Sequence, residues 1–232
     1  MPGGVDTNFF KPSPKNSGKL KHGCYRFLCC GKWEERKGNT DLLKSFCEEF
    51  RPDEKVELVL HCFNPYIPGF DLEREVQELN LPAHASIVCG RPLPPADLAT
   101  LYNSCDAFVL PTKAEGWGLP IIEAMACGLP VIVTDYSAHT EYVNSQNGYL
   151  IRVEKMIDVS DPMFFEPGQD YGKWAQPDLD HLKYLMRSVF ENRKEAAQKG
   201  LAARDDVSRN WTWDRSARIA GQYLSRLALD MS

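Results

Sequence analysis

The sequence lacks the features that mark membrane-spanning and secreted chains. None of its apolar runs approaches the roughly 18 residues that a transmembrane helix needs. The N-terminus also lacks the basic segment followed by an apolar segment that is typical of a signal peptide. From these two absences we expect a soluble, cytoplasmic protein without a membrane span.

An excess of basic residues is also missing. The chain has 27 Lys and Arg residues against 32 Asp and Glu residues, which gives a net charge of −5 at pH 7. Proteins that bind the phosphate backbone of nucleic acids usually carry a basic excess. The composition therefore predicts that nucleic acid is not a partner. Internal repeats and low-complexity tracts are absent as well.

Neither of the two common nucleotide motifs occurs in the sequence. There is no P-loop, which needs Gly four residues before Gly-Lys-Ser/Thr, and no dinucleotide fingerprint G-x-G-x-x-G. The absence of the dinucleotide fingerprint argues against an alternative function, a dinucleotide-dependent oxidoreductase, whose fold would be similar.

Cysteine is plentiful, but its spacing does not suggest a scaffold of disulfides or a metal site. The chain has 8 cysteines and no C-x-x-C pair, and most of them lie inside apolar patterns. Because Cys is among the most buried residue types, we expect reduced thiols in the core.

From Tyr25 onward, short apolar runs alternate with amphipathic helical stretches. Continuously apolar strands separated by helices indicate βαβ units and a parallel sheet that is covered on both faces. We therefore expect one α/β domain over residues 1–232, a doubly wound, Rossmann-like parallel sheet of about six strands with helices at its C-terminal end. The expected strands are 25–30, 56–62, 86–89, 107–110, 131–134 and 149–151. The expected helices are 39–51, 70–80, 95–103, 119–127, 137–143 and 178–198, followed by two more.

Two segments do not follow this alternation of strands and helices. Residues 1–23 are rich in Pro, Gly, Lys and Ser and are expected to form an irregular lead-in. Residues 152–177 are expected to form a long loop, whose scattered aromatic residues favour ordered packing. The Asp178-Leu-Asp180 sequence that follows has the D-x-D form of metal-dependent transferases, but its place after a proline at a helix start predicts capping instead.

The chain is organised around the stretch from Glu115 to Glu123, which follows a buried strand. Pro120 suits the first residue of a helix, so the stretch predicts a strand-to-helix turn. Gly116 and Gly118 allow close approach of another group to the backbone, and the helix N-terminus attracts anions. The turn is therefore an anion site with a carboxylate on either side.

The loop GKWEERKG after the first strand is a candidate second half of the same site. Lys32, Arg36 and Lys37 lie at the carboxyl end of a parallel strand, where ligands of such sheets bind, and their charges suit phosphate oxygens. The alternative is a solvated charged turn, because Glu34 and Glu35 offset the basic residues.

The two flanking carboxylates narrow the choice of anion. Glu123 on the first helical turn is explained by the helix dipole alone, whereas Glu115 lies outside the helix. A carboxylate beside a diphosphate repels it unless the carboxylate accepts hydrogen bonds, and sugar hydroxyls donate such bonds. A nucleotide diphosphate sugar satisfies all of these groups at once.

The pattern E-x7-E within AEGWGLPIIEAMACGLPVIVTD resembles the signature of GT-B glycosyltransferases of the family-4 type. GKWEERKG resembles the loop usually found as G-R-x4-K-G, and PGGVDTNFFKP resembles the entry into the C-terminal domain of such enzymes. LPPADLATLYNSCDAFVLPT and NGYLI also fit, so the resemblance covers nearly the whole chain.

This resemblance implies retaining hexosyl transfer from a nucleotide diphosphate sugar such as GDP-mannose or UDP-glucose, without a metal or other cofactor. It implies that Lys32 and Lys37 contact the diphosphate, Glu123 the ribose, and Glu115 the donor sugar, with Glu115 in the catalytic role. Lys32 stands where the family usually has Arg, so it binds as a point charge without the bidentate fork. The backbone N–H groups that would contact phosphate and sugar are those of Gly116, Trp117, Gly118 and Leu119.

The resemblance also implies a missing partner. Family members have an N-terminal domain that binds the acceptor, and this sequence starts where that domain would end. We therefore expect the isolated chain to bind the donor and to transfer sugar weakly or not at all, because a shared cleft brings the two substrates together. The alternative is a non-catalytic nucleotide-binding interaction module.

Other polar and aromatic residues carry weaker expectations. Arg91 follows a strand end and is a candidate contact for the nucleotide base. His139 follows the fifth strand and is either a substrate-side residue or an ordinary polar loop residue. Trp211 and Trp213 are expected to be packing anchors rather than stacking platforms.

Overall fold

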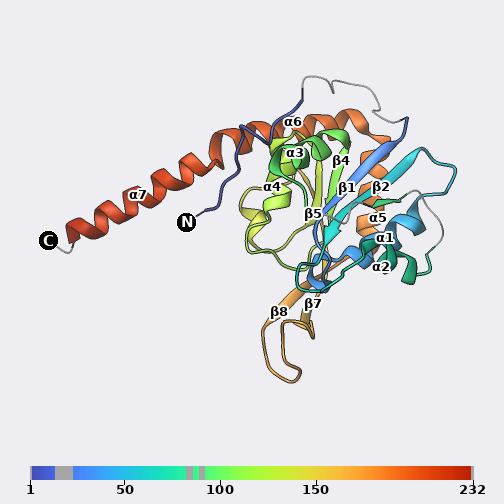
Figure 1. Cartoon of the computed structure of the whole chain (residues 1–232). Coiled ribbons are helices and arrows are strands. Elements are labelled where there is room, and N and C mark those ends of the chain that lie inside the picture. The colour runs from blue at the N-terminus through green and yellow to red at the C-terminus, as the bar shows by residue number, and fades with distance from the viewer. Residues whose placement is uncertain (1, 14–22, 82–85, 89–91, 231–232) are drawn as a thin grey trace.

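The structure is a computed structural model, and it describes residues 2–13, 23–81, 86–88 and 92–230 (Figure 1). A six-stranded sheet forms its centre, with the strand order β3-β2-β1-β4-β5-β6. All neighbouring strands in it are parallel. The order reverses between β1 and β4, as the doubly wound prediction requires. The strands are β1 (Tyr25–Lys32), β2 (Val56–Phe63), β3 (Ser86–Val88), β4 (Ala107–Leu110), β5 (Val131–Thr134) and β6 (Tyr149–Ile151).

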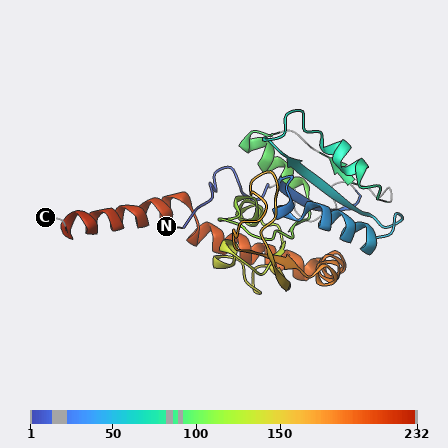
Figure 2. The same cartoon turned by 90° about the horizontal axis from the view of Figure 1, so that it is seen from below.

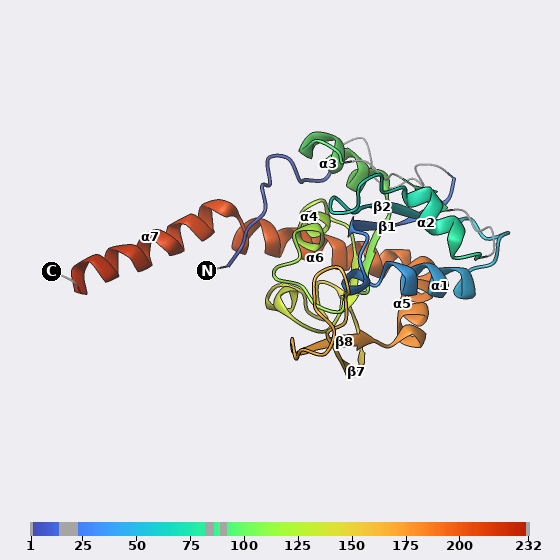
Figure 3. The same cartoon turned by 60° about the horizontal axis from the view of Figure 1, so that its bottom comes forward.

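Helices cover both faces of the sheet (Figures 2 and 3). Helix α5 packs against α1, and α6 packs against α4. Every residue of β4 and β5 is buried, which explains why both strands are continuously apolar. The five helices in this part are α1 (Asn39–Glu49), α2 (Leu72–Glu78), α3 (Pro95–Ser104), α4 (Leu119–Ala126) and α5 (Leu179–Glu191).

The predicted helices and strands are present in the described part of the chain, with corrections to two of the helices. The segment predicted as a helix over 137–143 forms a short 3-10 turn at Ala138–Glu141. The helix predicted over 178–198 was wrong in its extent, because α5 ends at Glu191 and α6 (Arg193–Asn210) begins after the single capping residue Asn192. The cysteines at 29, 30, 62, 105 and 127 are buried, as expected of core thiols.

The prediction of a long loop over 152–177 was wrong. This segment contains an antiparallel hairpin of β7 (Val153–Asp158) and β8 (Lys173–Pro177), which projects from the body (Figure 1). Four of the six β7 residues are exposed, whereas three of the five β8 residues are buried, so neither strand shows a regular apolar alternation in the sequence. The hairpin is anchored by Trp174, which is buried, and by the Ala175 N–H group, which donates to the Lys113 carbonyl oxygen at 3.0 Å.

The lead-in has no helix and only one strand-like bridge in its described part, as predicted. It still packs on the body: Val5 donates its N–H to the Trp211 carbonyl oxygen at 2.9 Å, and Phe10 contacts Tyr102 edge-on.

The last helix, α7 (Trp213–Asp230), extends away from the domain (Figures 1 and 2). Each side chain from Gly221 to Ala228 is exposed. Trp211 packs in the body as predicted, but the prediction for Trp213 was wrong, because 49% of it is exposed. Among the described residues, no helix is both long and apolar enough to cross a membrane.

Candidate functional site

A pocket lies at the carboxyl ends of β1 and β2, and the start of α4, which follows β4 in the chain, closes one side of it. It has a volume of about 840 Å³, part of which is open to solvent. Loops after β1 and β3 and the start of α4 border it, which brings the basic loop and the second half of the E-x7-E stretch together as the topology predicts. The first half, residues 115–118, is not among the residues that line this pocket. Its lining residues are Cys30, Gly31, Lys32, Arg36, Lys37, His61, Phe63, Pro92, Leu93, Leu98, Leu119, Pro120 and Glu123.

The turn before α4 has the predicted strand-to-helix geometry. Gly118 is the N-cap with a φ of 82°, and a Cβ there would lie 2.9 Å from both the Tyr142 hydroxyl oxygen and Ile121 Cδ1. The Tyr142 hydroxyl donates toward the carbonyl oxygens of Trp117 and Gly118, at 2.6 and 2.9 Å. Since C=O and N–H point in opposite directions in a trans peptide, the N–H groups of Gly118 and Leu119 point away from Tyr142.

The two other backbone candidates in this turn differ in their surroundings. Gly116 is exposed, and a Cβ there would meet nothing within 4 Å. The indole of Trp117 packs on Tyr142 and Trp211, with ring centroids 5.2 and 5.6 Å away. Trp117 can therefore serve the site through its backbone but not through its ring.

Glu115 forms an ion pair with Lys37. The Lys37 Nζ lies 2.6 Å from Glu115 Oε1, and the two side chains are only 7% and 6% exposed. The Arg36 guanidinium is 3.6 Å from the same oxygen. Burial acts to raise the pKa of Glu115, but the Lys37 ammonium outweighs it and holds that pKa below its ordinary value. Glu115 is therefore ionised and its charge is balanced, so an anion can approach it.

Gly38 permits the close approach that places Lys37 beside Glu115. It follows the 3-10 turn Glu35–Lys37 with a φ of 67°, and a Cβ on it would lie 2.3 Å from the Pro111 carbonyl oxygen. The loop after β1 thus packs directly on the loop after β4, and only glycine fits both the angle and the space.

We predict that Gly38→Ala destabilises the domain by more than about 2 kcal/mol, because it combines a strained φ with a backbone clash. Gly69→Ala is the matched control, since its φ is 71° and a Cβ there would meet nothing within 4 Å. The control should lose only about 1 kcal/mol. Urea denaturation of both variants measures the difference, and equal losses would contradict the packing argument.

Glu123 lies at the other side of the pocket, on the first part of α4. The Tyr102 hydroxyl donates to its Oε2 at 3.0 Å and is also 3.1 Å from the Pro120 carbonyl oxygen. Burial raises the pKa of Glu123 to about 7, although the Tyr102 hydrogen bond acts to lower it. Near neutral pH, this carboxylate therefore repels a bound phosphate less than an ordinary glutamate does.

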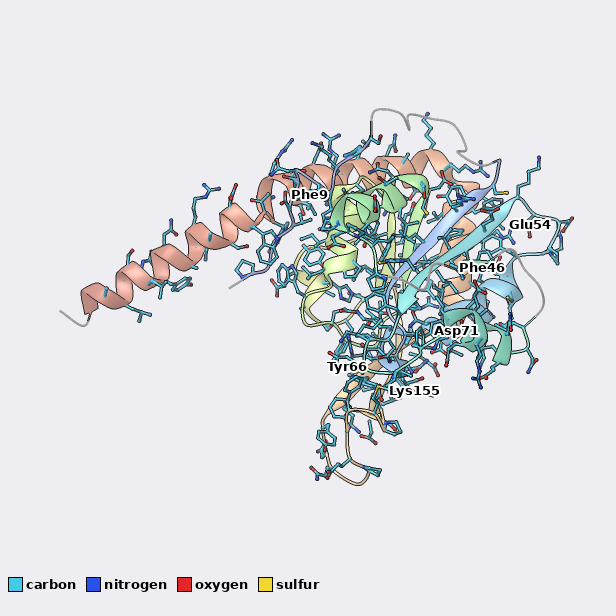
Figure 4. The ribbon with its side chains drawn as sticks, viewed as in Figure 1. Phe9, Phe46, Glu54, Tyr66, Asp71 and Lys155 are labelled. Carbon is cyan, nitrogen blue, oxygen red and sulfur yellow. The ribbon has the colours of Figure 1, made fainter. Side chains whose placement is uncertain are left out.

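Lys32 is the last residue of β1 and is one of the residues that line the pocket. Its Nζ lies 4.8 Å from the centre of the Tyr66 ring, which is a cation–π distance. Tyr66 lies near the base of the β7–β8 hairpin (Figure 4) and contacts Phe164 of that hairpin edge-on. The ring fixes the position of a cation that would otherwise be a flexible point charge.

Among the residues that the structure describes, His139 and Asp178 do not line the pocket. Arg91 lies outside the described residues. His139 is completely buried, and its Nε2 donates to the Thr134 carbonyl oxygen at 2.6 Å, so it fastens the loop after β5. Burial lowers the pKa of His139. Asp178 caps α5, as predicted, by accepting the His181 N–H at 2.9 Å.

Sequence reasoning missed the residues that hold the site in shape. Tyr102 is a buried tyrosine of α3, and Tyr142 is a buried tyrosine that directly follows the 3-10 turn Ala138–Glu141. No spacing in the sequence links them to the E-x7-E stretch. Cys30 and His61 could have been found, because they lie near the carboxyl ends of predicted neighbouring strands.

The comparisons with known proteins identify a family and a fold for the chain. The family model described as glycosyl transferases group 1 matches residues 24–161. A GDP-mannose-dependent phosphatidylinositol monomannoside mannosyltransferase of Mycolicibacterium smegmatis is 24% identical over 95% of this chain and 54% of its own length. A D-inositol 3-phosphate glycosyltransferase of Paenarthrobacter aurescens is 27% identical over 70% of this chain and 41% of its own length. The chain thus spans about half the length of these relatives.

Solved structures share the fold. The sucrose-phosphate synthase of Thermosynechococcus elongatus matches 100% of this chain and 52% of its own, with a TM-score of 0.74 and 22% identity. The C-terminal domain of a glycosyl transferase group 1 protein from Francisella tularensis is matched over its whole length and over 90% of this chain, with a TM-score of 0.67 and 21% identity. Anabaena HepE, solved with UDP-glucose, matches 96% of this chain and 56% of its own at a TM-score of 0.69 and 20% identity. The chain therefore belongs to the glycosyl transferases group 1 and has the fold of a GT-B C-terminal domain.

Proposed function

We propose that this chain is the donor-binding half of a retaining glycosyltransferase, which holds a nucleotide diphosphate sugar and needs an N-terminal acceptor domain for efficient transfer. The observation that carries the proposal is the convergence of Lys37, Glu123 and the α4 N-terminus on one pocket at the strand-order reversal. The known relatives support this class of donor, because one is GDP-mannose-dependent by name and another was solved with UDP-glucose.

In this proposal, the diphosphate lies at the N-terminus of α4. Lys37 uses one of its three N–H donors for Glu115 and keeps two for phosphate oxygens. Lys32 and the N–H groups of Gly118 and Leu119 add positive charge at the same place. These groups stabilise the negative charge that develops on the departing diphosphate. The proposed chemistry assigns the charge stabilisation to the chain itself and includes no metal ion.

The two carboxylates divide the rest of the donor between them. Glu123 accepts hydrogen bonds from ribose hydroxyls inside the pocket. Glu115 accepts from hydroxyls of the transferred sugar and orients its anomeric carbon toward the acceptor. Both carboxylates can accept hydrogen bonds, and the repulsion between each of them and the diphosphate is reduced. For Glu115 the reduction comes from the Lys37 ammonium, and for Glu123 it comes from the raised pKa.

We predict that Glu115→Gln weakens binding of the sugar nucleotide about tenfold and leaves binding of the free nucleotide unchanged or stronger, because only the sugar loses a charged acceptor. Calorimetry with UDP, GDP and ADP, and with UDP-glucose, GDP-mannose and ADP-glucose, measures both. Glu35→Gln is the control: Glu35 is in the same loop, but its side chain is 57% exposed and pairs with Lys113.

Two results would count against the proposal. Absence of binding for all six ligands would remove the donor site, and equal effects of Glu115→Gln on nucleotide and sugar nucleotide would remove the role of Glu115. Mixing the chain with a candidate N-terminal domain tests the enzymatic part. Restored transfer supports an enzyme fragment, whereas binding without transfer supports a non-catalytic interaction module.

A further inference from the structure

Ser137 has a backbone conformation that serine normally avoids. Its φ is 74° and its ψ is −163°. Among the described residues, only Asn80 and Ser137 are non-glycine residues with positive φ, and Asn80 has a φ of 48°, which asparagine tolerates. The Ser137 conformation belongs to a region that is essentially restricted to glycine. A glycine at position 137 would therefore be the relaxed choice, so the serine side chain needs an explanation.

The explanation lies in its contact with the candidate site. Ser137 Oγ accepts the backbone N–H of Glu115 at 2.8 Å, across 22 positions in the sequence. The Ala138 N–H donates back to the Glu115 carbonyl oxygen at 3.4 Å. Thr140 holds the other side of this loop, because its Oγ1 donates to the Ser137 carbonyl oxygen at 2.8 Å. Ser137 thus joins the loop after β5 to the loop after β4.

The peptide unit before Glu115 is held at both of its polar atoms. Its carbonyl oxygen, on Ala114, accepts the Thr112 hydroxyl at 3.0 Å and also the Arg36 guanidinium. Its N–H has Ser137 Oγ as the partner. The rotation of this peptide sets where the Glu115 side chain starts, and hence whether its carboxylate meets Lys37 at 2.6 Å. Without the Ser137 oxygen, the N–H side of this peptide loses its partner and only its carbonyl oxygen is held.

We propose that Ser137 is a positioning residue that fixes Glu115 for recognition of the donor sugar, and that its strained backbone is retained because glycine cannot supply the hydroxyl. The sugar-recognition part of this inference rests on the proposed function. The part that concerns the placement of Glu115 against Lys37 does not, so the two can be tested separately.

The test compares Ser137→Ala, Ser137→Gly and Ser137→Thr with the wild-type chain. Alanine keeps the strain and loses the hydroxyl, glycine loses both, and threonine keeps the hydroxyl under more strain because it is β-branched. The ligand readout is the ratio of the free-nucleotide Kd to the sugar-nucleotide Kd, measured with UDP and UDP-glucose and with GDP and GDP-mannose. We expect this ratio to fall about tenfold in the alanine and glycine variants and to remain near the wild-type value in the threonine variant.

Stability should change in a different order from recognition. We expect the Tm of the glycine variant to exceed that of the alanine variant by about 2 to 4 °C, and the threonine variant to melt lowest. Asn80→Gly is the matched control, because it places glycine at a positive φ that lies away from the pocket, and its ratio should equal that of the wild type. A purely structural role would make the ratio follow the Tm, which would overturn the inference.

A ligand-free readout separates this inference from the proposed function. NMR titration of the Glu115 carboxyl should show a higher pKa in the alanine and glycine variants than in the wild type, because the Lys37 contact is loosened, and no rise in the threonine variant. An unchanged pKa in all variants would overturn the positioning role. A raised pKa together with a wild-type chain that does not prefer sugar nucleotides would keep the positioning role and refute the proposed function.

Discussion

Lys37→Met should lower the free energy of unfolding by about 3 to 5 kcal/mol at neutral pH, the largest single-site effect that we expect in this chain. The reason is the ionised Glu115, which lies with only 6% of its side chain exposed and has the Lys37 ammonium 2.6 Å away. Methionine keeps the volume of the lysine stem and removes the charge, so the buried carboxylate loses its direct partner and keeps only the Arg36 guanidinium at 3.6 Å. Urea denaturation measures the loss.

The double variant Lys37→Met with Glu115→Gln provides the internal control. It removes the unpaired charge, so it should recover stability to within about 1 kcal/mol of the wild type. Lys183→Met provides the external control, because Lys183 pairs with Glu48 at 3.0 Å in a place where 63% of the Glu48 side chain is exposed. That variant should lose less than about 1 kcal/mol. A loss as small in Lys37→Met would show that water reaches the buried pair.

Glu123→Gln should stabilise the unliganded chain at pH 8 by up to about 3 kcal/mol and change its stability little below pH 4.5. Burial raises the pKa of Glu123 from its ordinary value of 4.5 to about 7 in the folded chain. A carboxyl with a raised pKa in the folded state contributes its full stability below the unfolded pKa, and this contribution is lost as the pH rises through 7. Glutamine stays neutral and can keep accepting the Tyr102 hydrogen bond.

The measurement is the difference in unfolding free energy between Glu123→Gln and the wild type from pH 4.5 to pH 8.5. The difference should grow across this window, and two parallel curves would contradict the raised pKa. Donor binding by the wild type should strengthen with pH, whereas its stability relative to the glutamine variant falls. The wild type should bind UDP-glucose or GDP-mannose more tightly as the pH rises through 7, because ribose hydroxyls favour the ionised carboxylate. The glutamine variant should lack that rise.

Burial determined which parts of the fold were predictable. The strands at 107–110 and 131–134 have the predicted ends, because β4 and β5 are buried on both faces and read as unbroken apolar runs. The β7–β8 hairpin was missed because β7 is mostly exposed and β8 depends on tertiary contacts such as that between Ala175 and Lys113. The break at Asn192 was missed because neither glycine nor proline marks it.

Topology determined which parts of the site were predictable. Lys32, Lys37 and Glu123 meet at one pocket because the carboxyl ends of parallel strands share one sheet edge. The direct pairing of Lys37 with Glu115 was not predicted, since it depends on how two loops pack at Gly38. The supports from Tyr102, Tyr142 and Ser137 depend on side-chain placement between distant elements, which local patterns do not encode.

The outward course of α7 divides the molecule into parts of very different local stability. Its first turns are tied down by Ser216, whose hydroxyl donates to the Gly3 carbonyl oxygen at 3.1 Å, but every side chain from Gly221 to Ala228 faces solvent. An isolated helix of this length is marginal in water, so the outer turns open without any help from the core. Amide protons there should exchange with solvent freely while those of β4 and β5 remain protected. The helical circular-dichroism signal of this chain is therefore the sum of two parts: a helix whose outer turns open locally, and a body that unfolds cooperatively.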